Sequence, residues 1–331
     1  MGGISRWRSG LRKYVGRALL AFLLTGTAAH AETYPERPIR ILVTAAPGGI
    51  TDLVARVVAE HIGAKTRQPA LVENRSGGSG NIGIEAAARA APDGYTLVVT
   101  GTSQISIAPA LYRHLAVDPL KELVPVAPVV EAPQILVVSA RLGVRTLGEF
   151  VARARAEPGK INYVSLGPGT TVHLAGDAFA RLAHIAIVPV QYRGTAPGIT
   201  DMMAGTVQMI SVGIAPVKPF IESGDLRVLA AATPRRLPYL PDVPTAAEAG
   251  VPGYEMTTWF GLFAPRGTPP AIVDTLNGYV RDLLADPAAS KRLTDMLVDP
   301  VSMTAPDFAT FLAADAAKGR RVVIESGAEM K

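Results

Sequence analysis

The stretch RILVTAAPGGITDLVARVVAEHI, residues 40–62, decides how the chain begins to fold. It opens with a continuous apolar run over 40–46, which predicts a strand covered on both faces. It closes over 52–62 with apolar residues at helical spacing, which predicts a helix. Between them, AAPGGITD at 45–52 is either a tight turn or a loop whose backbone binds an anion.

The strand–loop–helix pattern recurs along the chain. Further strands are predicted at 68–73 and 95–100, with a Gly-rich loop at 76–80 and a helix at 81–91 between them, which is typical of a parallel sheet. The pattern restarts with a strand at 134–138. The elements predicted after it are a helix at 146–156, a strand at 161–165, a Gly-rich loop at 167–171, a helix at 172–182, a strand at 186–192, a helix at 199–205, strands at 207–212 and 226–233, an extended run at 257–264, and helices at 269–285, 288–297 and 306–326. We therefore expect two α/β units with a ligand cleft between them.

The first 31 residues have the composition of a secretory signal peptide. Five basic residues precede an apolar run at 18–29, and Ala29-His30-Ala31 is a small-x-small cleavage site. The apolar run is too short to span a bilayer. Removing the five basic residues from the 33 Lys and Arg leaves 28, equal to the 28 Asp and Glu. The remaining chain is therefore formally neutral and gives no reason to expect nucleic acid as a partner.

Metal and thiol chemistry have little support in the sequence. The chain has no cysteine, which excludes disulfides, thiolate nucleophiles and Cys-ligated metals. The histidines after the signal segment form no metal-binding spacing, so neither a metal nor a cofactor is expected. The match GSGNIG at 78–83 fits a dinucleotide fingerprint, but the next predicted strand ends in VTGTS without the acid that would hold a ribose.

The loops AAPGGITD at 45–52 and SLGPGTTVHL at 165–174 form a pair. Each follows a predicted strand and opens a helix, where free N–H groups and the helix dipole favour negative charge. Thr51, Thr170 and Thr171 add hydroxyl donors, whereas Asp52 and Asp177 are interpreted as support for the helix starts. Two such loops could hold one carboxylate from both sides, or each could be a plain turn with capping residues.

Two further features have competing interpretations. Ser165, His173 and Asp177 can be drawn as a hydrolase triad, but their order and spacing match no nucleophile elbow. Trp259 and Phe260 are either core and hinge packing or rings that line the cleft.

Seven segments in order make the chain similar to the Bug family of periplasmic solute-binding proteins, the receptors of tripartite tricarboxylate transporters. They are YPERPIRILVTAAPGGITDLVAR (34–56), VENRSGGSGNIG (72–83), APDGYTLVV (91–99), YVSLGPGTTVHLAGDAF (163–179), VQYRGTAPGITDMMAGTVQ (190–208), LPDVPTAAEAG (240–250) and WFGLFAPRGTPPAIVDTLN (259–277).

The resemblance implies a two-lobed α/β fold of the periplasmic-binding-protein type II, or Venus-flytrap, kind with two interdomain crossings. We expect one lobe over 32–131 plus 256–331 and the other over 132–255. It also implies that backbone amides, hydroxyls and ordered waters hold a carboxylate without a cationic clamp. With neighbouring positions included, the candidate ligand-binding residues are Pro47, Gly48, Gly49, Ile50, Thr51, Asp52, Thr102, Ser103, Ser165, Gly167, Gly169, Thr170, Thr171, His173, Tyr192, Gly194 and Trp259.

The expected function is a monomeric periplasmic receptor for a small organic acid, with membrane permease subunits as partners and no catalytic residue. The alternatives are a sensory receptor without transport and a cleft hydrolase using Ser165, His173 and Asp177. Gln191, Arg193 and Gln208 depart from the family pattern in the second lobe and leave the particular solute open. If Arg193 turns inward, it could pair with a second carboxylate.

Overall fold

The computed structural model describes residues 34–326, so the predicted signal peptide lies outside the described residues. All helices and strands of the described residues belong to one unit that begins at Arg37. Within 34–326, no helix is both long and apolar enough to cross a membrane.

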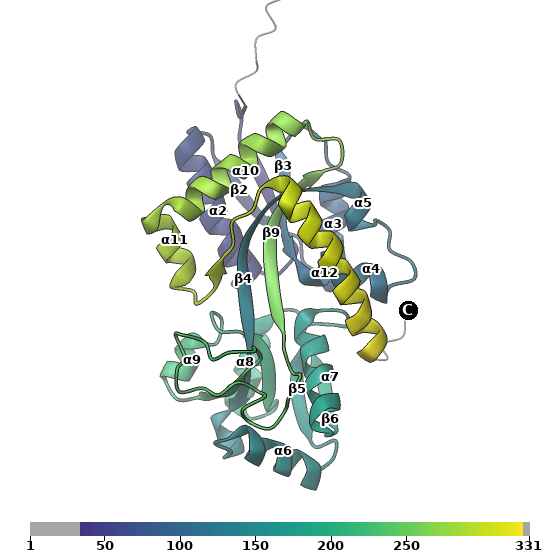
Figure 1. Ribbon diagram of the computed structural model, residues 1–331, viewed down its shortest axis with the longest axis vertical. Coiled ribbons are helices and arrows are strands. Elements are labelled where there is room, and N and C mark those ends of the chain that lie inside the picture. The colour runs from purple at the N-terminus through teal and green to yellow at the C-terminus, as the bar shows by residue number, and fades with distance from the viewer. Residues whose placement is uncertain (1–33, 327–331) are drawn as a thin grey trace, which may run out of the picture. The chain divides into compact units, whose positions relative to one another are not determined.

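The first lobe is a mixed sheet covered by helices (Figure 1). Its strands in spatial order are β2 (Ala70–Asn74), β1 (Ile39–Val43), β3 (Thr96–Gly101), β9 (Thr257–Pro265) and β4 (Leu123–Ser139), and β10 (Asp299–Pro300) pairs with β4. β1, β2 and β3 are parallel, as predicted, whereas β9 is antiparallel to both of its neighbours. The helices of this lobe are α2 (Ile50–Thr66), η1 (Gly78–Gly80), α3 (Asn81–Ala88), the π-helical segment η2 (Ser103–Ile107), α4 (Ala108–Leu111), α5 (Pro119–Glu122), α10 (Pro270–Ala285), α11 (Pro287–Thr294) and α12 (Ala305–Ser326).

The second lobe is built on the far end of β4. From there the sheet continues through β7 (Met209–Gly213), β5 (Ile161–Ser165) and β6 (Ile187–Gln191), and β8 (Leu226–Ala231) also pairs with β4. Its helices are η3 (Ala140–Leu142), α6 (Leu147–Ala156), α7 (Thr171–Ala183), α8 (Thr195–Ala204) and α9 (Lys218–Glu222). Buried apolar clusters fill this lobe on both sides of its strands.

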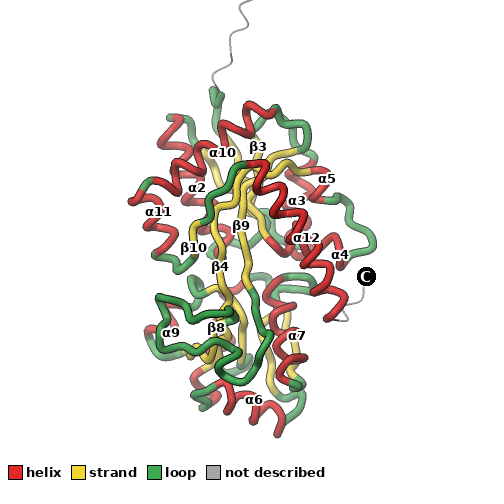
Figure 2. Tube along the Cα trace, viewed as in Figure 1, coloured by secondary structure: helices red, strands yellow, loops and turns green. Residues whose placement is uncertain are grey.

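The long strands β4 and β9 run between the two lobes side by side (Figures 1 and 2). β4 pairs with β9 as far as Pro133, and its pairing with β7 begins at the next residue, Gln134. The chain returns from β8 through the segment at 232–256 and enters β9 at Thr257. These two strands therefore carry the chain between the halves of a two-lobed α/β fold.

The structure differs from the prediction most clearly in β4. A strand was predicted only over 134–138. The stretch before it contains prolines at 125, 128 and 133, which lack the N–H donor that an interior strand uses. The observed strand has 17 residues, and its register against β9 shifts between Pro125 and Ala127 and again between Pro128 and Val130. Such irregularities accommodate residues that cannot donate to the ladder, so the strand continues through the prolines.

Candidate functional site

One pocket of about 840 Å³ lies between the lobes. Its walls come from the segments that follow β1, β2 and β3 in the first lobe and β5 and β6 in the second. The lining residues are Thr44, Ala45, Ala46, Gly49, Ile50, Thr51, Ser76, Gly77, Gly78, Ser79, Gly80, Gly101, Thr102, Ser103, Gln104, Leu166, Gly167, Pro168, Thr170, Thr171, Val172, Gln191, Tyr192, Arg193, Gly194, Thr195, Val212, Pro216, Thr258 and Phe260.

The first turn of α2 contributes free donors to this pocket. Its N-cap residue Gly49 makes no side-chain cap hydrogen bond, and the N–H groups of Ile50 and Thr51 have no acceptor among the described residues. The Thr51 hydroxyl also has no protein partner there, although Thr51 is largely buried. The positive end of α2 is therefore available to an anion.

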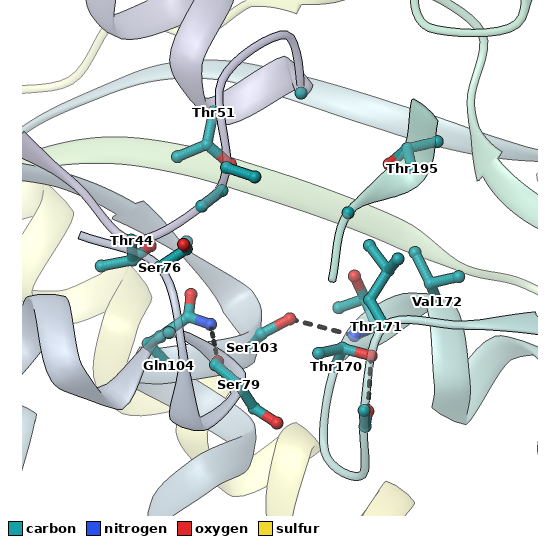
Figure 3. A pocket seen from close by; sticks show the side chains of 18 of the residues that line it. Thr44, Thr51, Ser76, Ser79, Ser103, Gln104, Thr170, Thr171, Val172 and Thr195 are labelled. Carbon is teal, nitrogen blue, oxygen red and sulfur yellow. Dashed lines mark hydrogen bonds between the residues drawn. The ribbon is translucent and has the colours of Figure 1, made fainter. Parts of the chain in front are cut away.

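The first turn of α8 offers a second set of donors. Gly194 precedes it with φ of +153° and no side-chain cap, and within the described chain the N–H groups of Thr195 and Ala196 find no acceptor. Figure 3 shows Thr51 and Thr195 on opposite sides of the pocket. Two uncapped helix starts, one from each lobe, thus border the same cavity.

The loop before α7 is arranged differently, because most of its amides already have protein acceptors. The N–H of Gly167 donates to Ser165 Oγ at 3.1 Å, and the N–H of Thr170 donates to the Gly167 carbonyl at 3.2 Å. The N–H of Thr171 crosses to the other lobe and donates to Ser103 Oγ at 3.0 Å (Figure 3). This loop therefore shapes the pocket wall and joins the lobes more than it supplies free amides.

Asp52 supports the first loop from behind. Its carboxylate accepts from the Gly48 N–H at 3.0 Å, from Arg56 Nε at 3.0 Å and from Asn74 Nδ2 at 3.0 Å. Burial by itself would raise the pKa of Asp52, but these hydrogen bonds outweigh burial and hold the pKa below its ordinary value. The carboxylate is only 3% exposed and does not line the pocket, which fits the supporting role expected for it.

The structure does bring Ser165, His173 and Asp177 together. Ser165 Oγ lies 3.0 Å from His173 Nδ1, and His173 Nε2 lies 3.1 Å from Asp177 Oδ2. However, Ser165 is fully buried and is not among the lining residues, and its oxygen accepts the Gly167 N–H. In this arrangement the hydroxyl cannot reach a molecule held in the pocket.

Aromatic side chains at the pocket take distinct roles. Tyr192 lines it, but its hydroxyl donates to Asp201 at 2.7 Å, and burial together with this hydrogen bond raises the pKa of Tyr192 to about 12. Trp259 faces the core instead, where its indole N–H donates to Asp315 at 2.7 Å. The neighbouring ring of Phe260 is the one that lines the pocket.

The π-helical segment η2 contributes Ser103, which was predicted, and Gln104, which was not. Gln104 Nε2 donates to the Ser79 carbonyl at 2.6 Å, which fixes the Gly-rich loop after β2 (Figure 3). Thr102, just before the segment, accepts from the backbone N–H of Trp259 at 3.0 Å. π-Helical turns are rare and often occur at functional sites, and propensity does not predict them.

The predicted site residues fall into two groups. Those that line the pocket are Gly49, Ile50, Thr51, Thr102, Ser103, Gly167, Thr170, Thr171, Tyr192 and Gly194. Those that do not line it are Pro47, Gly48, Asp52, Ser165, Gly169, His173 and Trp259. Sequence reasoning missed Ser79, Gln104 and Thr195, although Gly194 with Pro197 could have indicated an earlier start for α8.

The described lining of the pocket carries a single charged side chain. Among the described residues, Arg193 is the only charged side chain in the lining, and no carboxylate accompanies it there. No group of three or more His, Asp or Glu side chains is placed to hold a metal ion within 34–326. The remaining polar lining consists of hydroxyls, amides and backbone groups, which suit a small anion with an apolar body.

A two-lobed α/β fold with a donor-lined pocket between the lobes defines the class of solute-binding receptors. A family model described as "Tripartite tricarboxylate transporter family receptor" matches residues 54–328. BugT of Bordetella pertussis is 34% identical over 302 residues, which cover 91% of this chain and 93% of BugT. The chain therefore belongs to the tripartite tricarboxylate transporter receptor family, a family of periplasmic solute-binding receptors that includes the Bug proteins.

Solved structures agree with this assignment. The structure of Rpa4515 from R. palustris with adipate has a TM-score of 0.86 and 33% identity, and the match covers 89% of this chain and 98% of that one. MatC from Rhodopseudomonas palustris with bound malate has a TM-score of 0.82 and 32% identity, with 88% and 100% covered.

Proposed function

We propose that the chain is a periplasmic receptor that captures a small organic acid between its lobes. The observation that carries this proposal is the pair of uncapped helix starts, α2 at Ile50–Thr51 and α8 at Thr195, which border one pocket. Free N–H groups and two helix dipoles stabilise a carboxylate without a buried cation. The adipate and malate bound by related receptors support a carboxylate as the ligand class.

Transport would follow from closure of the lobes about the β4 and β9 crossings. The proposed division places 32–131 and 256–331 in one lobe and 132–255 in the other. The closed form would dock as a monomer on permease subunits of a tripartite tricarboxylate transporter, after export and cleavage of the signal peptide. The family supports this role over a sensory one.

We infer that the receptor is not an enzyme. A hydrolase would need a nucleophile that touches its substrate, and the covered position of Ser165 does not allow that contact. The absence of turnover of any bound acid in the experiment below would support this inference.

The test is a thermal-shift screen of the chain from Glu32 onward, refolded to remove any carried ligand, against organic acids that include adipate and malate. A ligand at 100 times its Kd adds about 2.7 kcal/mol of stability, which is roughly 5 °C for a protein of this size. A shift by one acid, without its consumption, supports the receptor. A flat panel of carboxylates would contradict the proposed ligand class.

Thr51→Val then locates the site, because it removes the unpaired hydroxyl at the α2 start while keeping the shape of the side chain. A hydrogen bond to a charged group contributes about 1.5–3 kcal/mol, so the Kd of the acid should rise roughly tenfold or more. Thr275→Val, on the exposed face of α10, is the matched control and should leave the Kd unchanged. Equal Kd values for Thr51→Val and wild type would place the carboxylate elsewhere.

A further inference from the structure

A chain of hydrogen bonds runs behind the loop that precedes α7. The Tyr163 hydroxyl donates to Asp177 Oδ1 at 2.5 Å, and Asp177 Oδ2 lies 3.1 Å from His173 Nε2. His173 Nδ1 lies 3.0 Å from Ser165 Oγ, and Ser165 Oγ accepts from the Gly167 N–H at 3.1 Å. This series of hydrogen bonds thus joins the strand β5, the first turns of α7 and the backbone of the loop.

The direction of each proton in this chain follows from what each group can donate. The carboxylate of Asp177 only accepts, because hydrogen bonds from His173 and Tyr163 outweigh its burial and hold its pKa below the ordinary value. The proton between Asp177 and His173 therefore resides on Nε2. In the Nε2–H tautomer Nδ1 is an acceptor, and the Ser165 hydroxyl donates to it. The Ser165 oxygen remains free to accept from Gly167.

The packing around Tyr163 holds the first residue of this hydrogen-bond series in place. A Cβ atom added at Gly176 would lie 2.2 Å from the Tyr163 ring, so the ring lies directly under α7 where only glycine fits. Tyr163 is 1% exposed, and its hydroxyl reaches the next residue of the helix, Asp177. The packing therefore leaves the Tyr163 ring little room beneath α7.

The last hydrogen bond of this series, from the Gly167 N–H to Ser165 Oγ, acts on the pocket wall. Gly167 has φ of +109° and lines the pocket together with Leu166, Pro168 and Thr170. Glycine adopts this conformation readily but also reaches many others, so a bonded amide is what limits its orientation. The Gly167 N–H has that partner in Ser165 Oγ.

The first lobe has a shorter version of the same arrangement. There Asp52 accepts directly from the N–H of Gly48, which has φ of +81° and belongs to the loop before α2. In both lobes an acidic side chain from the following helix, Asp52 or Asp177, holds a glycine amide of the binding loop. In the second lobe His173 and Ser165 bridge the longer distance.

We propose that Tyr163, Asp177, His173 and Ser165 are positioning residues that hold the Gly167 N–H and, through it, the second-lobe wall of the ligand pocket. They do not touch the ligand. The Nε2–H tautomer of His173 sets the direction of these hydrogen bonds: the ring donates to Asp177, and Ser165 donates to the ring. The expected effect on affinity rests on the proposed function, whereas the effect on loop order does not.

The test measures loop order first, without any ligand. Hydrogen–deuterium exchange of peptides spanning 163–174 is compared in wild type, Ser165→Ala and His173→Gln. Ser165→Ala removes the acceptor of Gly167, and the glutamine amide can reach Asp177 but not Ser165. Losing one hydrogen bond should speed exchange in this segment about two- to tenfold. His173→Asn, whose amide can still reach Ser165, should keep more of the protection.

Two matched controls carry the same types of substitution, Ser→Ala and His→Gln, at residues that do not belong to this series of hydrogen bonds. Ser139→Ala removes a buried hydroxyl that has no partner within the described residues, at the end of β4. His61→Gln alters a histidine of α2 whose Nε2 also finds no partner there. Both controls should leave exchange at 163–174 unchanged, and all variants should leave the 45–53 loop unchanged because Asp52 holds it separately.

A spectroscopic readout separates positioning from general stability. The ring-nitrogen spectrum of the ¹⁵N-histidine-labelled protein should show His173 as the Nε2–H tautomer in wild type. The Kd of an acid that binds in the thermal-shift screen should rise about two- to tenfold in Ser165→Ala and His173→Gln.

Each outcome decides the matter. Faster exchange confined to 163–174 in both variants, together with the Nε2–H tautomer, supports the proposal. Unchanged exchange in both variants, or an Nδ1–H tautomer in wild type, overturns it. If no acid binds wild type but the exchange result holds, the proposed carboxylate ligand is contradicted, whereas the positioning role of the four residues is supported.

Discussion

At the scale of single residues, Arg193 supplies the charge of the described pocket lining, and we propose that it sets how many carboxylates a ligand can carry. Among the described lining residues it is the only charged side chain, and it pairs with no carboxylate of the protein within 4.0 Å there. The helix starts of α2 and α8 can hold one carboxylate by themselves. The guanidinium is then available for a second carboxylate on the same ligand.

Arg193→Gln should therefore weaken the binding of dicarboxylates more than the binding of monocarboxylates with the same number of carbon atoms. For an exposed arginine we expect a loss of up to about fivefold for the dicarboxylate. Isothermal titration of a matched pair of acids measures the difference. Arg235→Gln, an exposed arginine of the same lobe, is the control. Equal losses for both acids would show that Arg193 does not contact the distal end.

Residue types alone could not decide which polar groups face the ligand. Thr51 and Ser165 both lie at a predicted strand–loop–helix junction, and both were predicted as ligand contacts. The fold leaves the Thr51 hydroxyl unpaired at the pocket and buries Ser165 against His173. The difference depends on the side chains packed behind each loop, which come from other parts of the chain.

At the scale of elements, helix α12 supports the site from a distance in sequence. Gly319 lies against the η2 segment, and a Cβ atom added there would lie 2.4 Å from the Ser106 carbonyl oxygen. Asp315 of α12 also accepts from the Ser106 hydroxyl and from the Trp259 indole. Because Ser103 and Gln104 belong to η2, the position of α12 affects one wall of the pocket.

Gly319→Ala should lower the free energy of unfolding by about 1–3 kcal/mol, because the methyl group meets backbone that cannot move aside cheaply. The acid should also bind more weakly. Gly278→Ala is the matched control: Gly278 lies inside α10 with nothing within 4 Å of an added Cβ. There the same change should raise stability by about 0.5–1 kcal/mol. Urea denaturation measures both, and effects of the same sign would contradict this packing argument.

Local sequence predicted some elements closely and others not at all. The strand at 161–165 was predicted with the observed bounds, because the short segment INYVS is followed directly by a Gly-rich loop. The extension of β4 through its prolines and the π-helical turn at η2 were missed. Both depend on neighbours: β4 on the irregular ladder with β9, and η2 on contact with α12.

At the scale of the whole molecule, direct hydrogen bonds join the lobes beside the pocket. The Tyr112 hydroxyl donates to the Pro168 carbonyl at 2.9 Å, and Ser79 Oγ donates to the same oxygen at 3.0 Å. Near them, Ile107 and Leu111 of the first lobe pack with Leu174 of α7. These contacts join the lobes in the arrangement that the structure describes, so we expect their loss to favour lobes that are further apart.

Tyr112→Phe should therefore favour the open form and raise the Kd of the acid about two- to tenfold, since one interlobe hydrogen bond is lost. Small-angle scattering with and without ligand should show a larger radius for the unliganded variant than for wild type. Tyr239→Phe is the control, because its buried hydroxyl has no partner among the described residues. An unchanged Kd together with unchanged scattering in Tyr112→Phe would mean that this contact does not affect closure.

The sequence by itself determined the alternation of strands and helices, the two Gly-rich loops and, through its seven matching segments, the receptor family. These are local properties, because periodicity, glycine and family motifs are read within short windows. Only the tertiary structure decided that α8 begins at Thr195 with free amides, that the α7 loop amides are already bonded, and that His173 lies behind the wall. A donor becomes available to a ligand only when no other part of the protein accepts from it, and that depends on segments distant in the chain.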